Sequence, residues 1–512
     1  MELKIDGKSD VPLYLQIKNR IIEQILAGTL RPGDRLPATR DLARRLGINR
    51  STVTNAYDEL LADGLLSSHV GQGTFVANKK EIPEFKSEPI KTEAISWQKM
   101  VWDGLFAGES EGRTISALLD LYQVSTIADV ISFSGSFPDE SSFPIAEFKS
   151  SLNHALREFG KSVLKYEQAA GLQALREYLA VDMRKRNIKA NTENILITNG
   201  SQQAIDLLAR SFISAGDKVI LENPTYPGAA NAFAALGAKL IGIPVDNQGM
   251  QVSNLEQIIV QQRPKLIYLI PTFHNPTGYT LSLERRHQLM EIVRKYKIPV
   301  LEDAYGEDLR YEGREIPSLK ALDVTDQVIY FGTFSKNLLP GIRIGWCVAP
   351  APVFTRLVAL KQIGDITTSP LLQAALWDFC HRRRYQAHLE RVRAIYRRRR
   401  DFVISRLQSY FPANTQWSEP QGGLFCWVKL PYQIDTTELL LETRQAGVVF
   451  SRGHLFHIDG SGHNTLRLSF GNLTETELDR GLKILGQTAI KLLNRSYSSA
   501  SDNFKQNTLP LI

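Results

Sequence analysis

Cysteine is scarce in this sequence, which has three cysteines among 512 residues. Cys347, Cys380 and Cys426 stand far apart and form no Cys-x-x-Cys pair, so the sequence predicts neither a disulfide framework nor a thiolate metal site. Long apolar runs are absent too: no stretch approaches the roughly 18 to 20 residues that span a bilayer, and the first residues, MELKIDGKSD, lack the apolar segment of a signal peptide. We therefore expect a cytoplasmic protein with reduced thiols, no metal site and no membrane partner.

Acidic residues are only slightly outnumbered by basic ones. The chain has 61 Lys and Arg residues and 54 Asp and Glu residues, which gives a formal charge of +7. Such a balance mildly favours a polyanionic partner, but the distribution of charge along the chain matters more than the total. With 43% hydrophobic and 22% charged residues, the composition is that of a globular protein long enough for two or more domains.

Residues 1–78 have the pattern of a compact unit of three short helices followed by a small hairpin. Apolar residues recur every four positions from Leu13 to Ile25, which predicts an amphipathic first helix. The segment ATRDLARRLG predicts a second helix, and RSTVTNAYDELLADG, preceded by Asn49 as a capping residue, predicts a third. LLSSHVGQGTFV then predicts a hairpin that turns at residues 71–73.

Basic residues gather on the second and third predicted helices. Between positions 35 and 54 the sequence has five arginines and a single acid, Asp41, and phosphate binding requires such a local excess of positive charge. Two helices joined by a tight turn, the second opening with NRST at positions 49–52, are typical of a helix-turn-helix that presents these residues to the DNA major groove. The alternative is a small helical bundle used for dimerisation, with its arginines on a solvent-exposed face.

The same segment resembles the winged helix-turn-helix of GntR-type bacterial regulators, on the joint occurrence of GDRLPATRDLA, NRSTVTNAYDEL and GQGTFV. The resemblance implies that this unit binds double-stranded DNA at an operator with paired half-sites. The residues that it implies to contact the DNA are Arg35, Arg40, Arg50, Ser51, Thr52, Thr54 and Gly73.

Residues 79–112 are charged and contain prolines, which predicts a linker. Beyond it, apolar runs such as NILIT, KVILE, KLIYLI, IPVLED and VIYFGTF alternate with amphipathic helical stretches. Such alternation predicts an α/β domain with a mostly parallel sheet and helices on both faces. Residues 496–512 then form a polar C-terminal tail.

Polar side chains follow several of these apolar runs. Asp303 and Tyr305 end VLEDAY, Asn275 lies in HNPTG after KLIYLI, and Lys336 follows VIYFGTFS. The carboxyl ends of parallel strands meet at one edge of a sheet, where α/β ligand sites assemble. A lysine that forms an imine with an aldehyde cofactor needs partners for the phosphate, the ring nitrogen and the phenolic oxygen of that cofactor, and each partner has a candidate here.

Asp303 suits a protonated ring nitrogen, and Asn275 with Tyr305 suits a phenolic oxygen. Ser201 and Gln202 begin the helix SQQAIDLLA, whose N-terminal amides suit a phosphate because helix N-termini bind anions. The remaining candidates are Thr333, Ser335 and Arg343 at the phosphate and Tyr226 stacked on the ring. Each of these residues taken singly is more simply explained as a cap, turn, core or surface residue.

The series as a whole resembles fold-type I pyridoxal-phosphate enzymes of the aminotransferase class I and II kind over residues 113–495, and SKNLLPGIRIGW is its most diagnostic piece. The resemblance implies that the domain ends in a smaller C-terminal α/β subdomain. The resemblance implies that Lys336 carries pyridoxal 5'-phosphate as a Schiff base and that Arg467 in NTLRLSF binds a substrate α-carboxylate. It also implies a homodimer, in which Tyr166 reaches the phosphate of the neighbouring subunit. GSFP at positions 135–138 and the Tyr166-Glu167 pair depart from the family pattern and leave the choice of substrate open.

A GntR-like domain joined to an aminotransferase-like domain resembles the MocR subfamily of bacterial regulators. The resemblance implies a cytoplasmic transcriptional regulator, associated with the nucleoid when bound to DNA. It would sense pyridoxal phosphate, or an amino acid or amine that reacts with it, through Lys336. The alternative is an active aminotransferase with an appended DNA-binding domain. A degenerate domain that only holds a dimer together is disfavoured by the retained lysine.

Two further clusters have simpler explanations than binding sites. The arginine-rich segment 381–400 is interpreted as a long helix with a solvated face, rather than as a second polyanion site. His454, His457 and His463 have no cysteine or carboxylate cluster beside them, so we interpret them as loop residues, one of which could line the substrate pocket.

Overall fold

The computed structural model describes residues 13–26, 29–62, 65–69, 73–77 and 130–506, which belong to two compact units. The predicted linker lies outside the described residues, as do positions 71 and 72 of the predicted turn. Within the described ranges, no helix combines the length and the apolar character that crossing a membrane requires.

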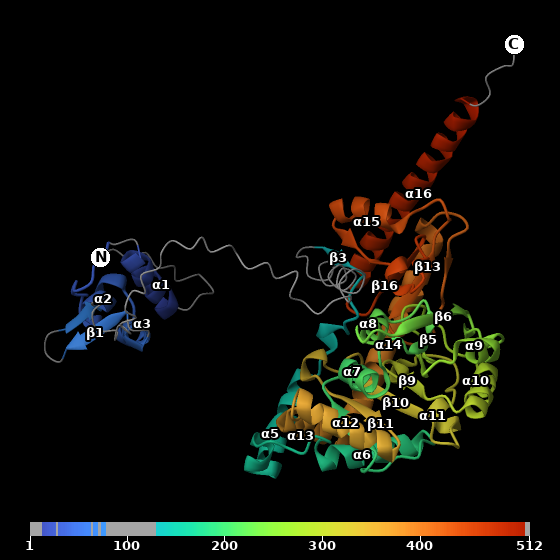
Figure 1. The fold of residues 1–512 in the computed structure, drawn as a ribbon. Coiled ribbons are helices and arrows are strands. Elements are labelled where there is room, and N and C mark those ends of the chain that lie inside the picture. Colours follow the sequence, from blue (N-terminus) through green and yellow to red (C-terminus); the bar gives the residue numbers. More distant parts are fainter. Residues whose placement is uncertain (1–12, 27–28, 63–64, 70–72, 78–129, 507–512) are drawn as a thin grey trace, which may run out of the picture. The chain divides into compact units, whose positions relative to one another are not determined.

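The first unit contains three helices and a two-stranded hairpin, in the predicted order (Figure 1). Its elements are α1 (Leu13–Leu26), α2 (Thr39–Leu46), α3 (Arg50–Ala62), β1 (Leu66–His69) and β2 (Gly73–Val76). The four-residue repeat of α1 buries Ile17 and Ile21 completely, and both belong to one hydrophobic cluster with Val53 of α3. The backbone N–H of Ser51 donates to the side chain of Asn49 at 3.2 Å, which confirms the predicted cap.

The second unit is built on an eight-stranded sheet in the order β4-β11-β10-β9-β8-β5-β6-β7. Its strands are β4 (Ile195–Thr198), β5 (Lys218–Asn223), β6 (Lys239–Asp246), β7 (Gly249–Met250), β8 (Leu266–Leu269), β9 (Val300–Asp303), β10 (Val328–Thr333) and β11 (Gly345–Val348). The strands from β10 to β6 in this order run parallel, and β7 and β11 pair antiparallel with their neighbours. Because β4 pairs antiparallel with β11, it has the direction of β10. The predicted mostly parallel sheet is confirmed.

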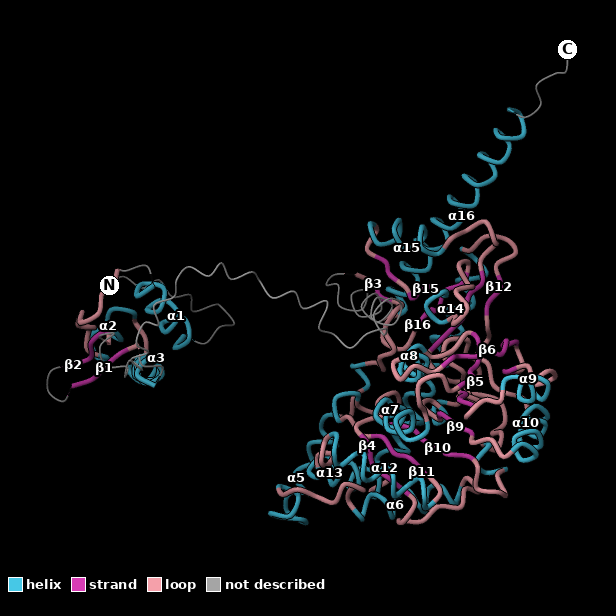
Figure 2. Tube along the Cα trace, viewed as in Figure 1, coloured by secondary structure: helices cyan, strands magenta, loops and turns pink. Residues whose placement is uncertain are grey.

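Helices cover both faces of this sheet (Figure 2). They are α5 (Ile145–Phe159), α6 (Gln173–Lys185), α7 (Ser201–Phe212), α8 (Pro227–Ala234), α9 (Leu255–Gln262), α10 (Leu283–Tyr296), α11 (Leu319–Leu322), α12 (Ala351–Gly364) and α13 (Pro370–His381). Successive residues of a strand point to opposite faces. In β8, Leu266 and Tyr268 belong to one hydrophobic cluster, whereas Ile267 and Leu269 belong to another. Burial on both faces explains why these strands have nearly continuous apolar sequences.

A smaller lobe contains a four-stranded antiparallel sheet in the order β12-β13-β16-β15, and a parallel pair of β14 with β3. Its elements are β3 (Ile131–Ser132), α14 (Arg384–Tyr410), β12 (Gln416–Trp417), β13 (Phe425–Lys429), α15 (Thr436–Gln445), β14 (Val448–Val449), β15 (Ser451–Arg452), the 3-10 helix η6 (Gly453–Phe456), β16 (Thr465–Ser469) and α16 (Glu475–Gln506). The helix α16 includes much of the predicted C-terminal tail, which is helical as far as Gln506.

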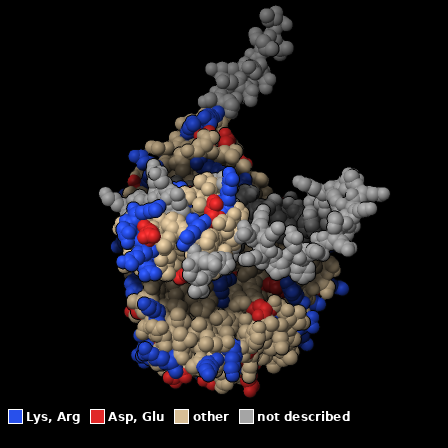
Figure 3. Space-filling view, turned by 90° about the vertical axis from the view of Figure 1, so that its left-hand side faces the viewer, with Lys and Arg blue, Asp and Glu red and all other residues tan. Residues whose placement is uncertain are grey.

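The arginine-rich segment forms the long helix that we predicted, α14, but its arginines do not all face solvent. Arg399 and Arg400 are buried, and each is paired with an acid: Asp139 and Glu312 lie 2.7 Å from their respective Nη2 atoms. The interpretation of the whole run as a solvated face is therefore wrong at these two positions. Figure 3 shows basic and acidic side chains on the face that it draws.

Arg286 of α10 is completely buried and holds the segment that follows β8. Its guanidinium donates to the carbonyl oxygens of Leu281, Pro317 and Pro271 at 3.0, 2.9 and 2.8 Å, and to the hydroxyl of Thr272 at 2.8 Å. Pro271 and Thr272 begin the loop that contains HNPTG. One buried side chain therefore satisfies several backbone oxygens beneath the candidate site.

We expect the substitution Arg286→Met to lower the free energy of unfolding of the second unit by about 3 kcal/mol or more, because buried oxygens lose their donor. Urea unfolding followed by circular dichroism measures the loss. Arg294→Met, at an exposed position of the same helix, is the matched control and should change stability by no more than about 0.5 kcal/mol. Equal losses in the two variants would show that the buried hydrogen bonds are not the cause.

Candidate functional site

The carboxyl ends of β4, β5, β8, β9 and β10 lie at one edge of the large sheet and supply most of the predicted site. Because these strands share one direction, the segments that follow them meet at that edge. The predicted residues there are Ser201 and Gln202 after β4, Tyr226 after β5, Asn275 after β8, Asp303 and Tyr305 at the end of β9, and Thr333, Ser335 and Lys336 at the end of β10. Arg343 lies between β10 and β11, and Arg467 comes from β16 of the smaller lobe.

Lys336 is held beside a backbone carbonyl and two cationic side chains. Its Nζ donates a hydrogen bond of 3.0 Å to the carbonyl oxygen of Ser136. Burial, together with the positive charges of Arg467 and Arg343, lowers the pKa of Lys336 from 10.5 to about 8. At pH 7 roughly one such amine in ten is neutral, against roughly one in three thousand at the ordinary value, and only a neutral amine attacks a carbonyl carbon.

Asp303 ends β9 and has 2% of its surface exposed. Its Oδ1 accepts the backbone N–H of Tyr305 at 3.0 Å, and its Oδ2 accepts the hydroxyl of Tyr268 at 2.9 Å. Burial raises the pKa of Asp303 to about 7, although both hydrogen bonds act in the opposite direction. The role predicted for Asp303 is to pair with a protonated ring nitrogen, and a cationic N–H placed beside this carboxyl would favour its ionised form.

Arg467 of β16 connects the smaller lobe to the loop after β8. Its Nη1 donates to Oδ1 of Asn275 at 2.9 Å, and its Nη2 donates to the carbonyl oxygen of Ser134 at 2.7 Å. Its guanidinium lies 4.3 and 4.9 Å from the ring centroids of Phe425 and Phe456. Burial lowers the pKa of Arg467 to about 10, so it stays charged at neutral pH. Its Nε has no hydrogen-bond partner among the described residues, which leaves a donor for a carboxylate.

Hydroxyl groups, an arginine and a helix N-terminus meet at the start of α7. Thr333 Oγ1 lies 3.0 Å from Ser335 Oγ, to which Nη1 of Arg343 donates at 3.1 Å. Nη2 of Arg343 donates to the carbonyl oxygen of Asn199 at 3.0 Å. Gly200 has a φ of +81°, and a Cβ at this position would lie only 2.6 Å from Nη2 of Arg343. This arrangement suits a phosphate.

Tyr226 and Gln202 are hydrogen-bonded to each other. The Tyr226 hydroxyl donates to Oε1 of Gln202 at 3.0 Å, and Nε2 of Gln202 donates to the carbonyl oxygen of Gly228 at 3.0 Å. The structure does not bring Tyr166 into the site of its own chain, because 84% of its surface is exposed. The contact with a neighbouring subunit that we expect of Tyr166 stays a prediction.

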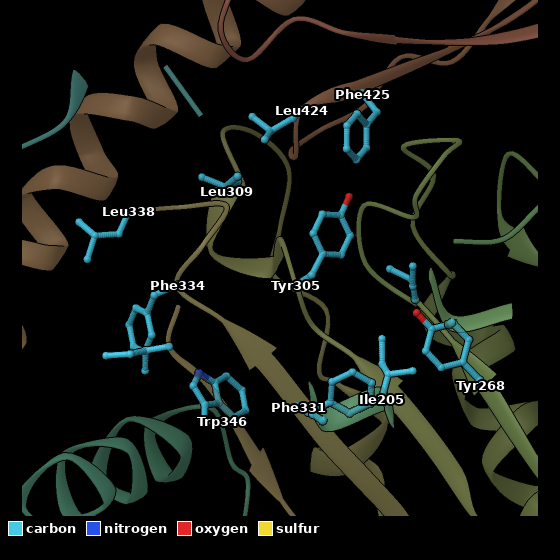
Figure 4. Close-up of a cluster of buried hydrophobic side chains, with 14 of the residues drawn as sticks. Ile205, Tyr268, Tyr305, Leu309, Phe331, Phe334, Leu338, Trp346, Leu424 and Phe425 are labelled. Atoms are coloured by element: carbon cyan, nitrogen blue, oxygen red, sulfur yellow. The ribbon is translucent and has the colours of Figure 1, made fainter. Parts of the chain in front are cut away.

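Tyr268 lies in β8 and contacts Asp303, but it was not among the predicted site residues. Figure 4 shows part of the apolar cluster to which Tyr268 belongs, together with Tyr305, Phe425 and two residues close to Lys336 in the sequence, Phe334 and Leu338. A signal was available, since a hydroxyl in a strand that is buried at every position must find a hydrogen-bond partner. The carbonyls of Ser134 and Ser136 carried no such signal, because every residue has one.

The predicted DNA-contacting residues of the first unit lie in the segment before α2 (Arg35), on α2, on α3 and at the start of β2. Arg35, Arg40, Arg50 and Ser51 are exposed, and Thr52, Thr54 and Gly73 are partly exposed. Nε of Arg50 lies 3.4 Å from Thr39 Oγ1, and the Thr54 hydroxyl donates to the carbonyl oxygen of Arg50 at 3.1 Å. A Cβ on Gly73 would lie 2.9 Å from Nε of Arg35, so the hairpin passes close to that arginine. The N-terminus of α3 therefore presents a guanidinium and hydroxyls to solvent.

Comparisons with known proteins match both units. The family model described as aminotransferase class I and II matches residues 129–485, and the model described as bacterial regulatory proteins, gntR family, matches residues 13–76. Aromatic-amino-acid aminotransferase 1 of Thermococcus litoralis is 34% identical over 80% of this chain and 98% of its own. The probable rhizopine catabolism regulatory protein MocR of Rhizobium meliloti is 31% identical over 88% of each chain. The crystal structure of LysN, an alpha-aminoadipate aminotransferase of Thermus thermophilus, superposes with a TM-score of 0.72 at 32% identity and covers 77% of this chain and 100% of its own.

We expect Tyr268→Phe to raise the pKa of Asp303 further, because the carboxylate loses a donor. Between about pH 4 and pH 7, Asp303 is protonated in the folded protein and ionised in the unfolded chain. The contribution of Asp303 to the free energy of unfolding therefore falls as the pH rises through that range. The loss of stability in Tyr268→Phe should therefore be larger at pH 8 than at pH 6. Urea unfolding of cofactor-free protein at both pH values measures it.

The variant Asp303→Asn provides the control for this experiment. Asparagine does not titrate, so adding Tyr268→Phe to Asp303→Asn should cost the same at pH 6 and pH 8. A pH-dependent cost in both backgrounds would mean that another group, and not Asp303, responds to the loss of the hydroxyl.

Proposed function

The chain belongs to the aminotransferase class I and II family and, through its gntR-family first unit, to the MocR subfamily of regulators, and from this we propose that it regulates transcription. The first unit binds DNA, and the second unit holds pyridoxal 5'-phosphate and responds to an amino compound that reaches Lys336. The regulator acts in the cytoplasm. It binds an operator with two half-sites as a homodimer, in which Tyr166 completes the site of the partner.

One observation carries this proposal: an amine with a lowered pKa, a buried carboxyl and a built anion site lie together at one sheet edge. In our proposal Arg343, Ser335 and the amides at the N-terminus of α7 hold the phosphate. Asp303 faces the ring nitrogen. The missing Cβ at Gly200 keeps the approach to Arg343 open, so the residues fit the cofactor.

Asn275 and Tyr305 are proposed to hold the phenolic oxygen of the cofactor, and Tyr226 to lie on its ring. Oδ1 of Asn275 is occupied by Arg467, so its Nδ2 is the atom that would donate. The Tyr305 hydroxyl now donates to the carbonyl oxygen of Phe273 at 2.8 Å and would have to turn toward the ligand. When bound, pyridoxal phosphate supplies an aldehyde that condenses with primary amines, and its ring withdraws electrons from the α-carbon of the condensed amine.

The proposed effector is an amine that carries a carboxylate. Arg467 offers a charged fork whose Nε has no partner among the described residues, and it stands near enough to Lys336 to lower its pKa. A carboxylate on Arg467 would therefore bring the effector amine to the position of Lys336. The freed Lys336 amine, with its lowered pKa, would then be a base close to the effector α-carbon.

An active aminotransferase is the second candidate function, and the full set of polar residues at the site favours it. Lys336, Asp303, Asn275 and Arg467 lie in one site, which a domain used only for dimerisation would not require. Adding amino acids one at a time to cofactor-loaded protein separates the two functions. Release of the oxo acid identifies an aminotransferase, whereas a lasting spectral change without release identifies a sensor that has kept capture and lost turnover.

We expect pyridoxal phosphate to become attached to Lys336. Borohydride reduction followed by peptide mass mapping should place the label on Lys336, and Lys336→Ala should abolish it. Labelling should speed up as the pH rises toward 8, because the lowered pKa of Lys336 then releases the neutral amine. Lys295→Ala, at an exposed lysine of α10, should label normally. A label that persists in Lys336→Ala would place the attachment on another lysine.

We expect Arg50→Ala to weaken operator binding by about tenfold, because one phosphate or base contact is lost. The slope of log K against the logarithm of the salt concentration should become shallower by about one. The operator is first selected from random duplexes, and binding is then measured by fluorescence anisotropy at several salt concentrations. Arg20→Ala, at an exposed arginine of α1, is the matched control. Unchanged binding by Arg50→Ala would contradict the proposed docking of α3.

A further inference from the structure

A hollow of the second unit, with a volume of about 540 Å³, lies between the large sheet and the smaller lobe. Its walls come from the ends of β5 and β6 and the loop after β8 on one side. On the other side they come from β12, β13 and the loop before β16. We call this hollow the interlobe groove. Its volume falls within the range of about 300–1,000 Å³ that is typical of small-molecule pockets.

Aromatic side chains form much of the wall of the interlobe groove. Trp417 of β12, Trp427 of β13 and Tyr279 of the loop after β8 all line it. Trp427 has 8% of its surface exposed, and Trp417 is partly exposed. Rings presented in this way from both lobes favour a planar ligand that stacks between them.

Among the described residues that line the groove, the one acidic side chain is paired and the one lysine is not. Asp246 lines it, but Nη1 and Nη2 of Arg285 hold its two carboxylate oxygens at 2.6 and 2.8 Å. Lys429 lines it as well, is exposed, and has no salt bridge within the part of the chain that the structure describes. An anionic group entering the groove would therefore find a cation that no acid already neutralises.

Trp427 and Lys429 stand two residues apart on β13, so their side chains lie on the same face of the sheet, about 6.7 Å apart along the strand. A ring and a carboxylate separated by one or two carbon atoms can bridge such a span. We propose that the interlobe groove is a binding site for a small aromatic carboxylate, with its ring against the tryptophans and its carboxylate on Lys429.

Trp427 and Phe456 connect the interlobe groove to the candidate active site. Trp427 packs edge-on against Phe456, with ring centroids 5.8 Å apart, and Phe456 lies over the guanidinium of Arg467. Phe456 also accepts the backbone N–H of Thr225 at 2.8 Å through its carbonyl oxygen, next to Tyr226. A ligand that displaces Trp427 in the groove would therefore act on Arg467 through Phe456.

The lobes are further joined beside the groove. Asn223, at the end of β5, donates from Nδ2 to Oδ2 of Asp459 at 2.9 Å and accepts the backbone N–H of Ile458 at 3.1 Å. Asn223 also lines the groove. An aromatic carboxylate bound there contacts both lobes at this junction, so its binding changes the affinity of Arg467 for a carboxylate, and by linkage the reverse also holds.

Calorimetric titration of the full chain with indole-3-acetate tests this site, because this probe has an aromatic ring and a carboxylate but no amine that could react at the active site. We expect binding by wild type, and about tenfold weaker binding by Lys429→Gln and by Trp417→Ala. Lys265→Gln, at an exposed lysine outside the groove, should bind as wild type does. Lys429 is exposed, so its variant does not disturb packing.

Arg467→Ala separates the groove from the candidate active site. We expect this variant to keep its affinity for indole-3-acetate to within about threefold if the probe occupies the groove. Loss of binding in Arg467→Ala with normal binding in Lys429→Gln would place the probe at the active site and overturn the proposal. Absence of binding by wild type at millimolar probe would overturn it as well. Neither result depends on DNA binding or on the cofactor.

Discussion

The shared direction of β4, β5, β8, β9 and β10 is the constraint on which the second unit depends. Parallel strands cannot be joined by tight turns, so the chain returns through helices that cover both faces of the sheet. The same crossovers bring every carboxyl end to one edge. Asp303 and Lys336 meet there because β9 and β10 are neighbours in the sheet. The site is therefore a consequence of the strand order, and its polar residues occupy positions where the chain must leave the sheet.

Burial at this edge acts on the acid and the base through the same physical cause. Surroundings of low polarity disfavour the charged form of each group, which raises the pKa of Asp303 to about 7 and lowers that of Lys336 to about 8. Tyr268 and Tyr305 offset part of the cost for the carboxyl, whereas Arg467 and Arg343 add to the cost for the amine. The apolar cluster beneath the site thus contributes to its chemistry as well as to stability.

The smaller lobe contributes a cation, Arg467, that crosses to the loop after β8. Arg467 is held between Phe425 and Phe456 and bonds to Asn275, so the separation of the two lobes fixes the position of its guanidinium. The interlobe groove adjoins this arrangement through Trp427, which lines the groove and packs against Phe456. The first unit has a hydrophobic core of its own, built around Ile17, Ile21 and Val53, which matches its separate function in binding DNA.

The sequence by itself determined the local structure and the chemical inventory of the site. Apolar period, Asn49 as a cap and polar residues after apolar runs act over a few positions, so the helices of the first unit, the parallel sheet and the strand ends that contain Asp303, Asn275 and Lys336 could all be predicted. Only the tertiary structure decided which distant groups meet. Lys336 contacts the carbonyl of Ser136, which is 200 positions away. The contacts of Tyr268, the buried ion pairs of Arg399 and Arg400, and the groove between the lobes have the same origin. They depend on how strands, helices and lobes pack against one another, and neither period nor spacing along the chain encodes that packing.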